Sequence, residues 1–273
     1  MGHATSTSNA AVDVAQASFR READMLSPLQ EYATVVVPGD VDSSDDVDWR
    51  VLFEVPTVNG VVDVLYAAFD EQAVNYRRQA GLAPIIQWHE LLVFAALQLS
   101  ARRPIILADL ALRVGMTPTG LRRGALSRLA ASGHIELVDG DSVISKWSYR
   151  LPTRALIAVE AKRLDWRRAV SQARRYTSFA DRTFIAIEPT AAVRAQKQRK
   201  IIESSGIGIL SVDPGTRQVH RLMQAPIHSP ATLHRMFAAE QSLEVAWDGR
   251  VSGPVLPVFG RSLTTSEGVD PRL

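Results

Sequence analysis

Residues 157–162 read Ile157-Ala158-Val159-Glu160-Ala161-Lys162, an apolar run that ends in an acid and a lysine. The run predicts a buried strand over Ala155–Val159 that continues to the charged pair. Because side chains along a strand alternate between its two faces, Glu160 and Lys162 point the same way and Ala161 points to the other face. The sequence therefore predicts an acid beside a lysine at one end of a sheet.

A predicted hairpin upstream carries a second acid. Strands over Arg50–Pro56 and Val61–Phe69 are expected to meet at the turn pair Asn59-Gly60. Asp63 lies inside the apolar run of the second strand, where a carboxylate without a partner would be costly. A metal ion held by Asp63 and Glu160 would remove that cost. We therefore expect the two carboxylates on adjacent strands and on one face.

Elsewhere outside residues 85–150 the chain alternates strands and helices, which is typical of an α/β fold. Further strands are predicted over Thr183–Ile187 and Ile207–Val212, and helices over Trp166–Phe179, Pro189–Ser205 and Ala231–Gln241. Before the hairpin we predict a disordered tail over residues 1–15, a helix that ends at Glu31 and an acidic loop over Pro38–Asp48. Residues 226–273 are expected to hold the last helix and a polar tail.

Residues 85–150 have a different pattern, with helices predicted over Ile85–Ala101, Ile106–Val114 and Thr117–Ala131. A ribbon of His134–Val138 and Ser142–Ile144 follows, around the type I′ turn pair Asp139-Gly140. This order, and the segment from Leu107 to Leu137, resemble a winged helix-turn-helix. In that family the third helix contacts DNA, and here it carries Arg122, Arg123 and Arg128.

The order of Asp63, Glu160 and Lys162 resembles the PD-(D/E)xK nuclease superfamily. Glu54 lies on the strand before the turn, as an acid does in many members, and Gln172 and Tyr176 match the Q-x-x-x-Y helix of RecB-like members. The resemblance covers residues 50–69 and 154–222. It implies a restriction-endonuclease-like mixed sheet flanked by helices, built from residues 16–84 and 151–225. About 95 residues separate the Asp63 and Glu-x-Lys strands, more than in many members, and an inserted winged helix accounts for them.

The resemblance implies a metal-dependent DNA endonuclease. Asp63, Glu160 and the Ala161 carbonyl would be oxygen ligands for Mg²⁺ or Mn²⁺, and Glu54 would complete the shell directly or through water. Lys162 would position the attacking water and stabilise charge, while Gln172 and Tyr176 would orient the lysine or contact a phosphate. Whether one metal or two would bind is open.

Charge is distributed unevenly along a chain whose net charge is only +2. Residues 1–50 hold nine acids against three arginines, whereas residues 151–200 hold twelve bases against four acids. A basic segment on a nearly neutral chain predicts a surface for a polyanion, with a solvated helix face as the plain alternative. Beside the three arginines of the winged helix, the predicted phosphate contacts are Lys146, Arg194, Lys197, Arg199 and Lys200.

Composition excludes several classes of protein. The absence of cysteine excludes disulfides and thiolate zinc sites, and no P-loop is present. No apolar stretch approaches the roughly 18 residues that a membrane helix needs. Together with the lack of cysteine, this leads us to expect a cytoplasmic protein. The basic segments and the two resemblances make DNA its expected partner. A homodimer is left open. Two other functions also stay open: a winged-helix DNA-binding regulator on an inactive nuclease scaffold, and an adaptor whose winged helix binds protein.

Overall fold

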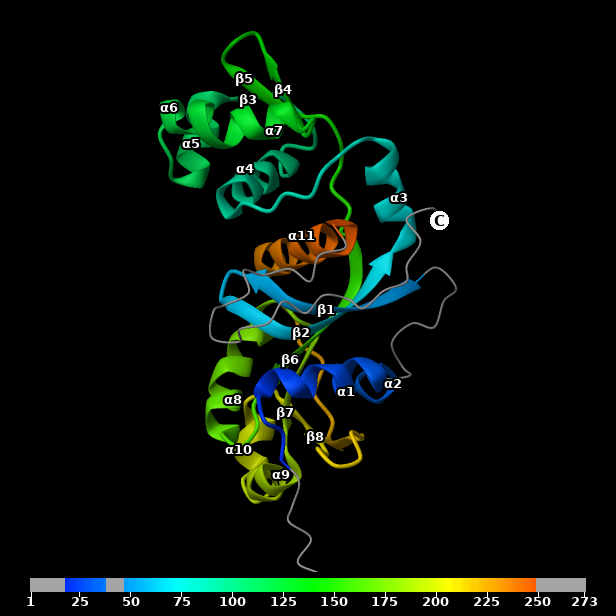
Figure 1. Cartoon of the computed structure of the whole chain (residues 1–273). Coiled ribbons are helices and arrows are strands. Elements are labelled where there is room, and N and C mark those ends of the chain that lie inside the picture. The colour runs from blue at the N-terminus through cyan, green and yellow to red at the C-terminus, as the bar shows by residue number, and fades with distance from the viewer. Residues whose placement is uncertain (1–17, 38–46, 249–273) are drawn as a thin grey trace, which may run out of the picture.

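A computed structural model of the chain describes residues 18–37 and 47–248. The predicted tail over residues 1–15, residues 38–46 of the predicted acidic loop and the tail beyond residue 248 lie outside the described residues. Figure 1 shows a sheet in the middle of the molecule, helices on both of its faces and a small helical module at one end. Within the described ranges, no helix is both long and apolar enough to cross a membrane.

The sheet is mixed and has six strands in the order β1-β2-β6-β7-β8-β9. Its bounds are β1 Val47–Thr57, β2 Gly60–Asp70, β6 Thr153–Ala161, β7 Arg182–Ile187, β8 Gly208–Val212 and β9 Val219–Met223. Pairs β6–β7 and β7–β8 are parallel, and the other neighbours are antiparallel. The predicted α/β class and mixed sheet flanked by helices are confirmed.

Two details of the strands differ from the prediction. The hairpin loop is Val58-Asn59 rather than Asn59-Gly60, because Gly60 pairs with Thr57 as the first residue of β2. Strand β9 was not predicted, since its central residues His220 and Arg221 are exposed and polar. Pairing with β8, not its own composition, makes that segment a strand.

Helices cover both faces of the sheet (Figure 1). One layer holds α8 (Trp166–Ala173), the 3₁₀ turn η3 (Arg174–Ser178), α9 (Pro189–Gln196) and α10 (Arg199–Ser204), and the other holds η1 (Glu22–Met25), α1 (Leu26–Glu31) and α2 (Ala33–Val36). Strand β6 is buried on both sides: Leu156 and Ala158 pack under α8, whereas Ile157 and Val159 pack under α1. The single helices predicted over Trp166–Phe179 and Pro189–Ser205 are each divided, the second by the non-helical backbone of Gln198.

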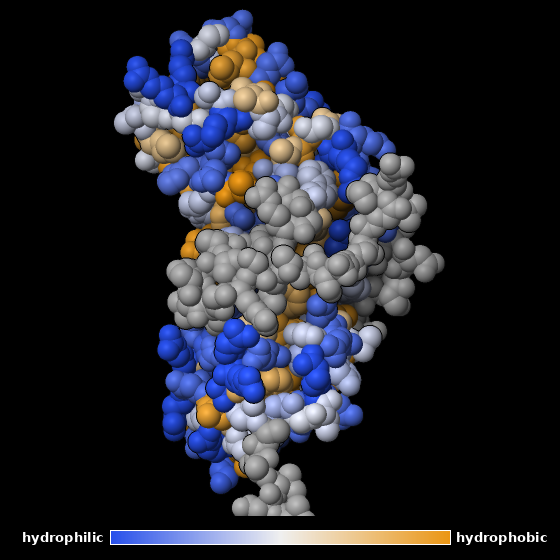
Figure 2. All heavy atoms as spheres, in the orientation of Figure 1, coloured by the Kyte–Doolittle hydropathy of each residue, from blue (hydrophilic) through white to orange (hydrophobic). Residues whose placement is uncertain are grey.

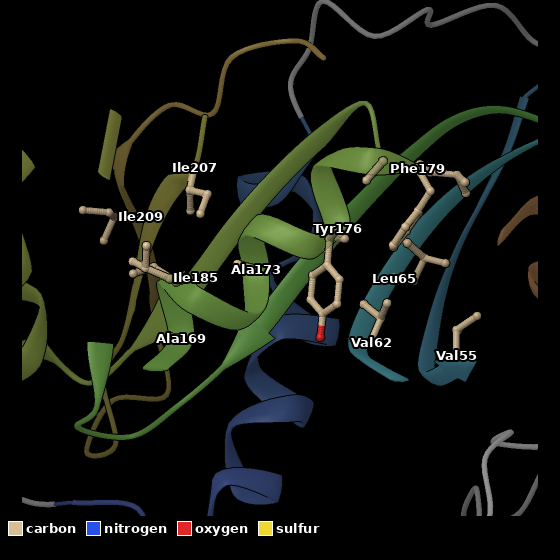
Figure 3. Packing of buried hydrophobic residues seen from close by; sticks show 14 of the residues in the cluster. Val55, Val62, Leu65, Ala169, Ala173, Tyr176, Phe179, Ile185, Ile207 and Ile209 are labelled. Carbon is tan, nitrogen blue, oxygen red and sulfur yellow. The ribbon is translucent and has the colours of Figure 1, made fainter. Parts of the chain in front are cut away.

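Figure 3 shows how the α8 layer meets the sheet. The side chains of Ala169 and Ala173 on α8 are small, which lets the helix approach the strands closely. The ring of Tyr176 is buried beside Val62, and its hydroxyl points out of the apolar cluster. A polar group is thereby brought to the ends of β2 and β6.

Between β2 and β6 the chain forms a separate module. After α3 (Glu71–Gln79), which was not predicted, come α4 (Trp88–Gln98), β3 (Ile105–Ile106), α5 (Leu107–Val114), α6 (Pro118–Leu121), a π-helical turn η2 (Arg122–Leu126), α7 (Ser127–Ala131), β4 (Ile135–Val138) and β5 (Ser142–Ser145). Strands β3, β5 and β4 form a small antiparallel sheet. Asp139 and Gly140 have the positive φ that the predicted type I′ turn requires, 49° and 75°, but the pair Val138↔Ser142 makes the loop three residues long, with Asp141 as its third residue. Ile106 pairs with Ser142 instead of starting a helix.

The last helix, α11 (Thr232–Asp248), is longer than predicted and lies between the module and the sheet (Figure 1). Met236 and Phe237 pack into the core of the module, whereas Ala238, Leu243 and Val245 pack into the core of the sheet. The module and the sheet therefore share one helix.

Candidate metal and catalytic site

The register of the sheet aligns three carboxylates across adjacent strands. Pairs Phe53↔Val64 and Val55↔Val62 flank Glu54 and Asp63, so these two residues lie opposite each other on β1 and β2. The ladder between β2 and β6 ends at Val64↔Val159, and its next position places Asp63 opposite Glu160. The structure thus brings together the acids that the sequence indicated.

The ammonium group of Lys162 lies at the centre of this cluster. Its Nζ is 2.9 Å from Glu160 Oε1, 3.1 Å from Glu22 Oε2 and 3.8 Å from Asp63 Oδ2, and it donates to the Ala161 carbonyl at 3.1 Å. Burial alone would lower the pKa of Lys162, but the charges of Asp63, Glu160 and Glu22 together outweigh it and raise that pKa. The lysine therefore stays charged.

Glu160 is almost completely buried, at 1% exposure. The Tyr176 hydroxyl donates to its Oε2 at 2.5 Å and also lies 3.0 Å from the Val61 carbonyl oxygen. Burial, followed by the charges of Glu160 and Asp63, raises the pKa of Tyr176, which keeps the phenol protonated as a donor. Oxygen Oε1 of Glu160 has the ion pair with Lys162 but makes no well-directed hydrogen bond among the described residues.

Asp63 is held by the backbone of the neighbouring strand, because its Oδ2 accepts from the Ala161 amide at 2.8 Å. Burial, followed by the charge of Glu160, raises the pKa of Asp63 to about 7, although Lys162 and the Ala161 amide oppose the shift. Two carboxylates this close resist being charged together. A divalent cation would relieve that repulsion more fully than one ammonium group.

Glu54 has an unusual backbone, with φ of 50° inside β1. A positive φ is uncommon outside glycine, and such strained residues gather at functional sites. Burial raises the pKa of its carboxyl group. Glu54, Glu22, Asp63 and Ala161 line a cavity of about 20 Å³, which has room for one water molecule or ion.

Glu22 is the member of the cluster that the sequence did not indicate. It lies on η1, and the preceding residues are fixed to the sheet: Ser18 Oγ and the Phe19 amide donate to the buried carboxylate of Glu188 at 2.8 and 3.1 Å. Arg163 Nε donates to the same carboxylate at 3.0 Å. Nothing local marks Glu22, because its role depends on a contact with a residue far away in the chain.

Gln172 makes no hydrogen bond to the cluster among the described residues. It lies one turn before Tyr176, and its Oε1 is buried with no hydrogen-bond partner in the part of the chain that the structure describes. No hydrogen bond joins it to Lys162 there, so the orientation of the lysine comes from the three carboxylates and the Ala161 carbonyl.

The cluster contains oxygen atoms that could bind a metal ion. Among the described residues, no three His, Asp or Glu side chains are arranged tightly enough to form a metal site unaided. Two carboxylates and a backbone carbonyl do converge on one point, where the ammonium of Lys162 now lies. Oxygen ligands of this kind suit Mg²⁺ or Mn²⁺, and Glu160 Oε1, which now pairs with Lys162, is one of them. The residues fit a hard divalent cation once Lys162 withdraws.

The predicted DNA contacts lie in two places. On the module, Arg123 and Lys146 are exposed, but Arg122 binds Asp141 at 2.7 Å and Arg128 binds Glu90. Arg194, Lys197, Arg199 and Lys200 are all exposed on and between α9 and α10. Figure 2 shows hydrophilic side chains both on the module and over these helices.

No protein-family model, curated protein or solved structure matches the chain. The resemblance to PD-(D/E)xK nucleases therefore stays a prediction from the sequence.

Proposed function

We propose that the protein is a metal-dependent DNA endonuclease of the PD-(D/E)xK type with an inserted winged helix. The observation that carries the proposal is the convergence of Asp63, Glu160 and Lys162 from two adjacent strands onto one buried point. Burying several charges is unfavourable for stability, so a cluster of this kind points to chemistry. The short link from Tyr176 to Glu160 adds a residue from the following helix.

Each residue has a distinct task in this proposal. Asp63, Glu160 and the Ala161 carbonyl would hold the cation, with Glu54 or Glu22 beside it. The bound cation would supply Lewis-acid chemistry and a lowered pKa of water. Lys162 would hold the attacking water and face the charge that develops on the phosphate. Tyr176 would keep Glu160 in its rotamer by donating to Oε2.

The module would anchor the duplex as a winged helix. Its order of three helical segments and a hairpin favours this, as do the exposed Arg123 and Lys146. Arg122 and Arg128 would have to exchange Asp141 and Glu90 for phosphates, which reduces their net contribution to affinity. The basic residues of α9 and α10 would add a second contact area.

The deciding experiment is nicking of supercoiled plasmid in Mg²⁺ and in Mn²⁺ by the wild type, Lys162→Ala and Asp63→Asn. Asp48→Asn is the matched control, because Asp48 is a β1 acid paired with Arg50 at 2.6 Å, away from the cluster. We expect Lys162→Ala and Asp63→Asn to lose cleavage and Asp48→Asn to keep it. Equal nicking by wild type and Lys162→Ala would contradict the proposal.

One observation favours a second function, a DNA-binding regulator on an inactive scaffold. Lys162 already neutralises the carboxylates without a metal, as a purely structural ion cluster would. In that case no variant and no metal would produce cleavage, while gel shifts would still show DNA binding by the module.

A further inference from the structure

A groove lies between α8 and α10, formed by residues to which the proposed cleavage assigns no role. Its volume is about 590 Å³, within the roughly 300–1,000 Å³ typical of ligand pockets. Figure 1 shows the two helices on the same side of the sheet, and Figure 2 shows apolar side chains between hydrophilic ones on that face. The residues that define the groove are Trp166, Arg167, Val170, Arg174, Gln198 and Ile201.

The groove combines an apolar floor with cationic walls. Trp166 and Val170 are largely buried, whereas the Ile201 side chain is 59% exposed and leaves apolar surface open to a ligand. The guanidinium of Arg167 lies 4.7 Å from the centre of the Trp166 ring. Such a site suits a flat ligand that has an apolar face, polar edges and attached negative charge.

The surroundings favour an anion. The same helices and turns carry further exposed bases, namely Arg168, Arg175, Arg194, Lys197, Arg199 and Lys200. From Trp166 to Ser178 the chain has no acid, and α9 has none. The nearby acids are Asp165, which caps α8, and Glu203, which lies 3.9 Å from Arg199.

We propose that this groove binds an unpaired nucleotide of single-stranded DNA, with the base on the apolar floor and the phosphates on Arg167 and Arg174. Duplex DNA would offer only phosphates, because its bases are stacked and cannot reach Ile201. The inference rests on the proposed function for the choice of DNA as ligand, but it needs no cleavage. An enzyme with this groove acts on DNA that has a single-stranded end, flap or gap.

The test measures binding by fluorescence anisotropy in EDTA, so that cleavage plays no part. The probes are labelled oligo(dT), an abasic oligomer of equal length, and a duplex. The variants are Ile201→Ser and Arg174→Ala. The matched control is Val193→Ser, which is 57% exposed on α9 and changes an apolar residue outside the groove in the same way. Thermal melting confirms that each variant is folded.

We expect Ile201→Ser to weaken oligo(dT) binding about fivefold or more and to leave binding of the abasic oligomer unchanged. Arg174→Ala should lower the salt slope for oligo(dT) by about 0.7, the value for one phosphate contact on a single strand. Equal affinity for oligo(dT) and the abasic oligomer overturns the inference. The inference is also overturned if Ile201→Ser and Val193→Ser weaken oligo(dT) binding equally. A third contrary result is that Ile201→Ser weakens duplex binding as much as oligo(dT) binding, which would assign the groove to a duplex.

The inference and the proposed function fail separately. If the protein never cuts DNA but binds oligo(dT) through Ile201, the groove inference stands and the proposed nuclease function fails. If the protein cuts DNA and both Ile201→Ser and Arg174→Ala bind oligo(dT) as tightly as the wild type, the proposed nuclease function stands and the groove inference fails.

Discussion

The pair Arg77–Glu240 joins the module to the sheet, and its disruption gives a sharp prediction. Arg77 of α3 and Glu240 of α11 are 1% and 0% exposed, and two contacts of 2.5 and 2.9 Å connect them. Glu240 also accepts from the Ile85 amide at 2.7 Å and from the Tyr149 hydroxyl at 3.0 Å. Ile85 belongs to the segment that leads into the module and Tyr149 to the segment that leads out of it. The Glu240 carboxylate therefore holds both segments.

Arg77→Met would remove the cation and leave Glu240 buried with two neutral donors. Breaking a buried pair in this way costs about 3–5 kcal/mol, a large part of the roughly 5–15 kcal/mol that stabilises a typical fold. The double variant Arg77→Met/Glu240→Gln removes both charges and keeps an acceptor for Tyr149. We therefore expect it to be more stable than the single variant by at least about 1 kcal/mol.

Urea unfolding followed by linear extrapolation measures these differences. The matched control is Arg199→Met, which breaks the exposed pair with Glu203 at 3.9 Å and should change the free energy of unfolding by less than about 0.5 kcal/mol. A free energy for Arg77→Met within about 1 kcal/mol of the wild type would refute the reasoning. So would a double variant that is less stable than the single one.

Three further predictions concern the cluster and the module. Burial and Glu160 raise the native pKa of Asp63 to about 7 from an ordinary value of 3.8. Between these two values the native state holds a proton that the unfolded chain has lost, so the free energy of unfolding falls as the pH rises from the lower value to the higher one, and the stabilising contribution is gone above pH 7. Asp63→Asn, which never ionises, should therefore melt at a higher temperature than the wild type at pH 8 in EDTA, with the gain shrinking toward pH 5; a gain that is constant with pH would contradict this assignment. Mg²⁺ or Mn²⁺ should raise the melting temperature of the wild type but not of Glu160→Gln, and Asp48→Asn should respond like the wild type; an equal rise in all three would place the ion elsewhere. Arg123→Ala and Lys146→Ala should each weaken duplex binding and lower its salt slope by about 0.9, and an unchanged slope would assign the module to a protein partner.

Much of the architecture follows from local sequence signals. The apolar run before Lys162 predicts the strand that ends at Ala161, and the pair Asp139-Gly140, which tolerates positive φ, predicts a turn. Gly115 ends α5 with φ of 67°, and Thr117 caps α6 by accepting from the Gly120 amide at 3.1 Å. These features depend on residues that are close together in the chain, so a pattern of a few residues is sufficient to predict them.

Only the tertiary structure decided which distant groups meet. Glu22 joins the cluster through Lys162, Arg128 is paired with Glu90, and Glu240 is buried against Arg77. In the sequence each of these is an ordinary charged residue on a helix or turn. Burial and partner are properties of packed elements, because a charge buried by a distant segment must find its counter-charge there. The sequence by itself determined which acids lie on the strands and which lysine follows them, whereas the packing of the N-terminal turn brought Glu22 to that cluster and the packing of α11 buried Glu240 against Arg77.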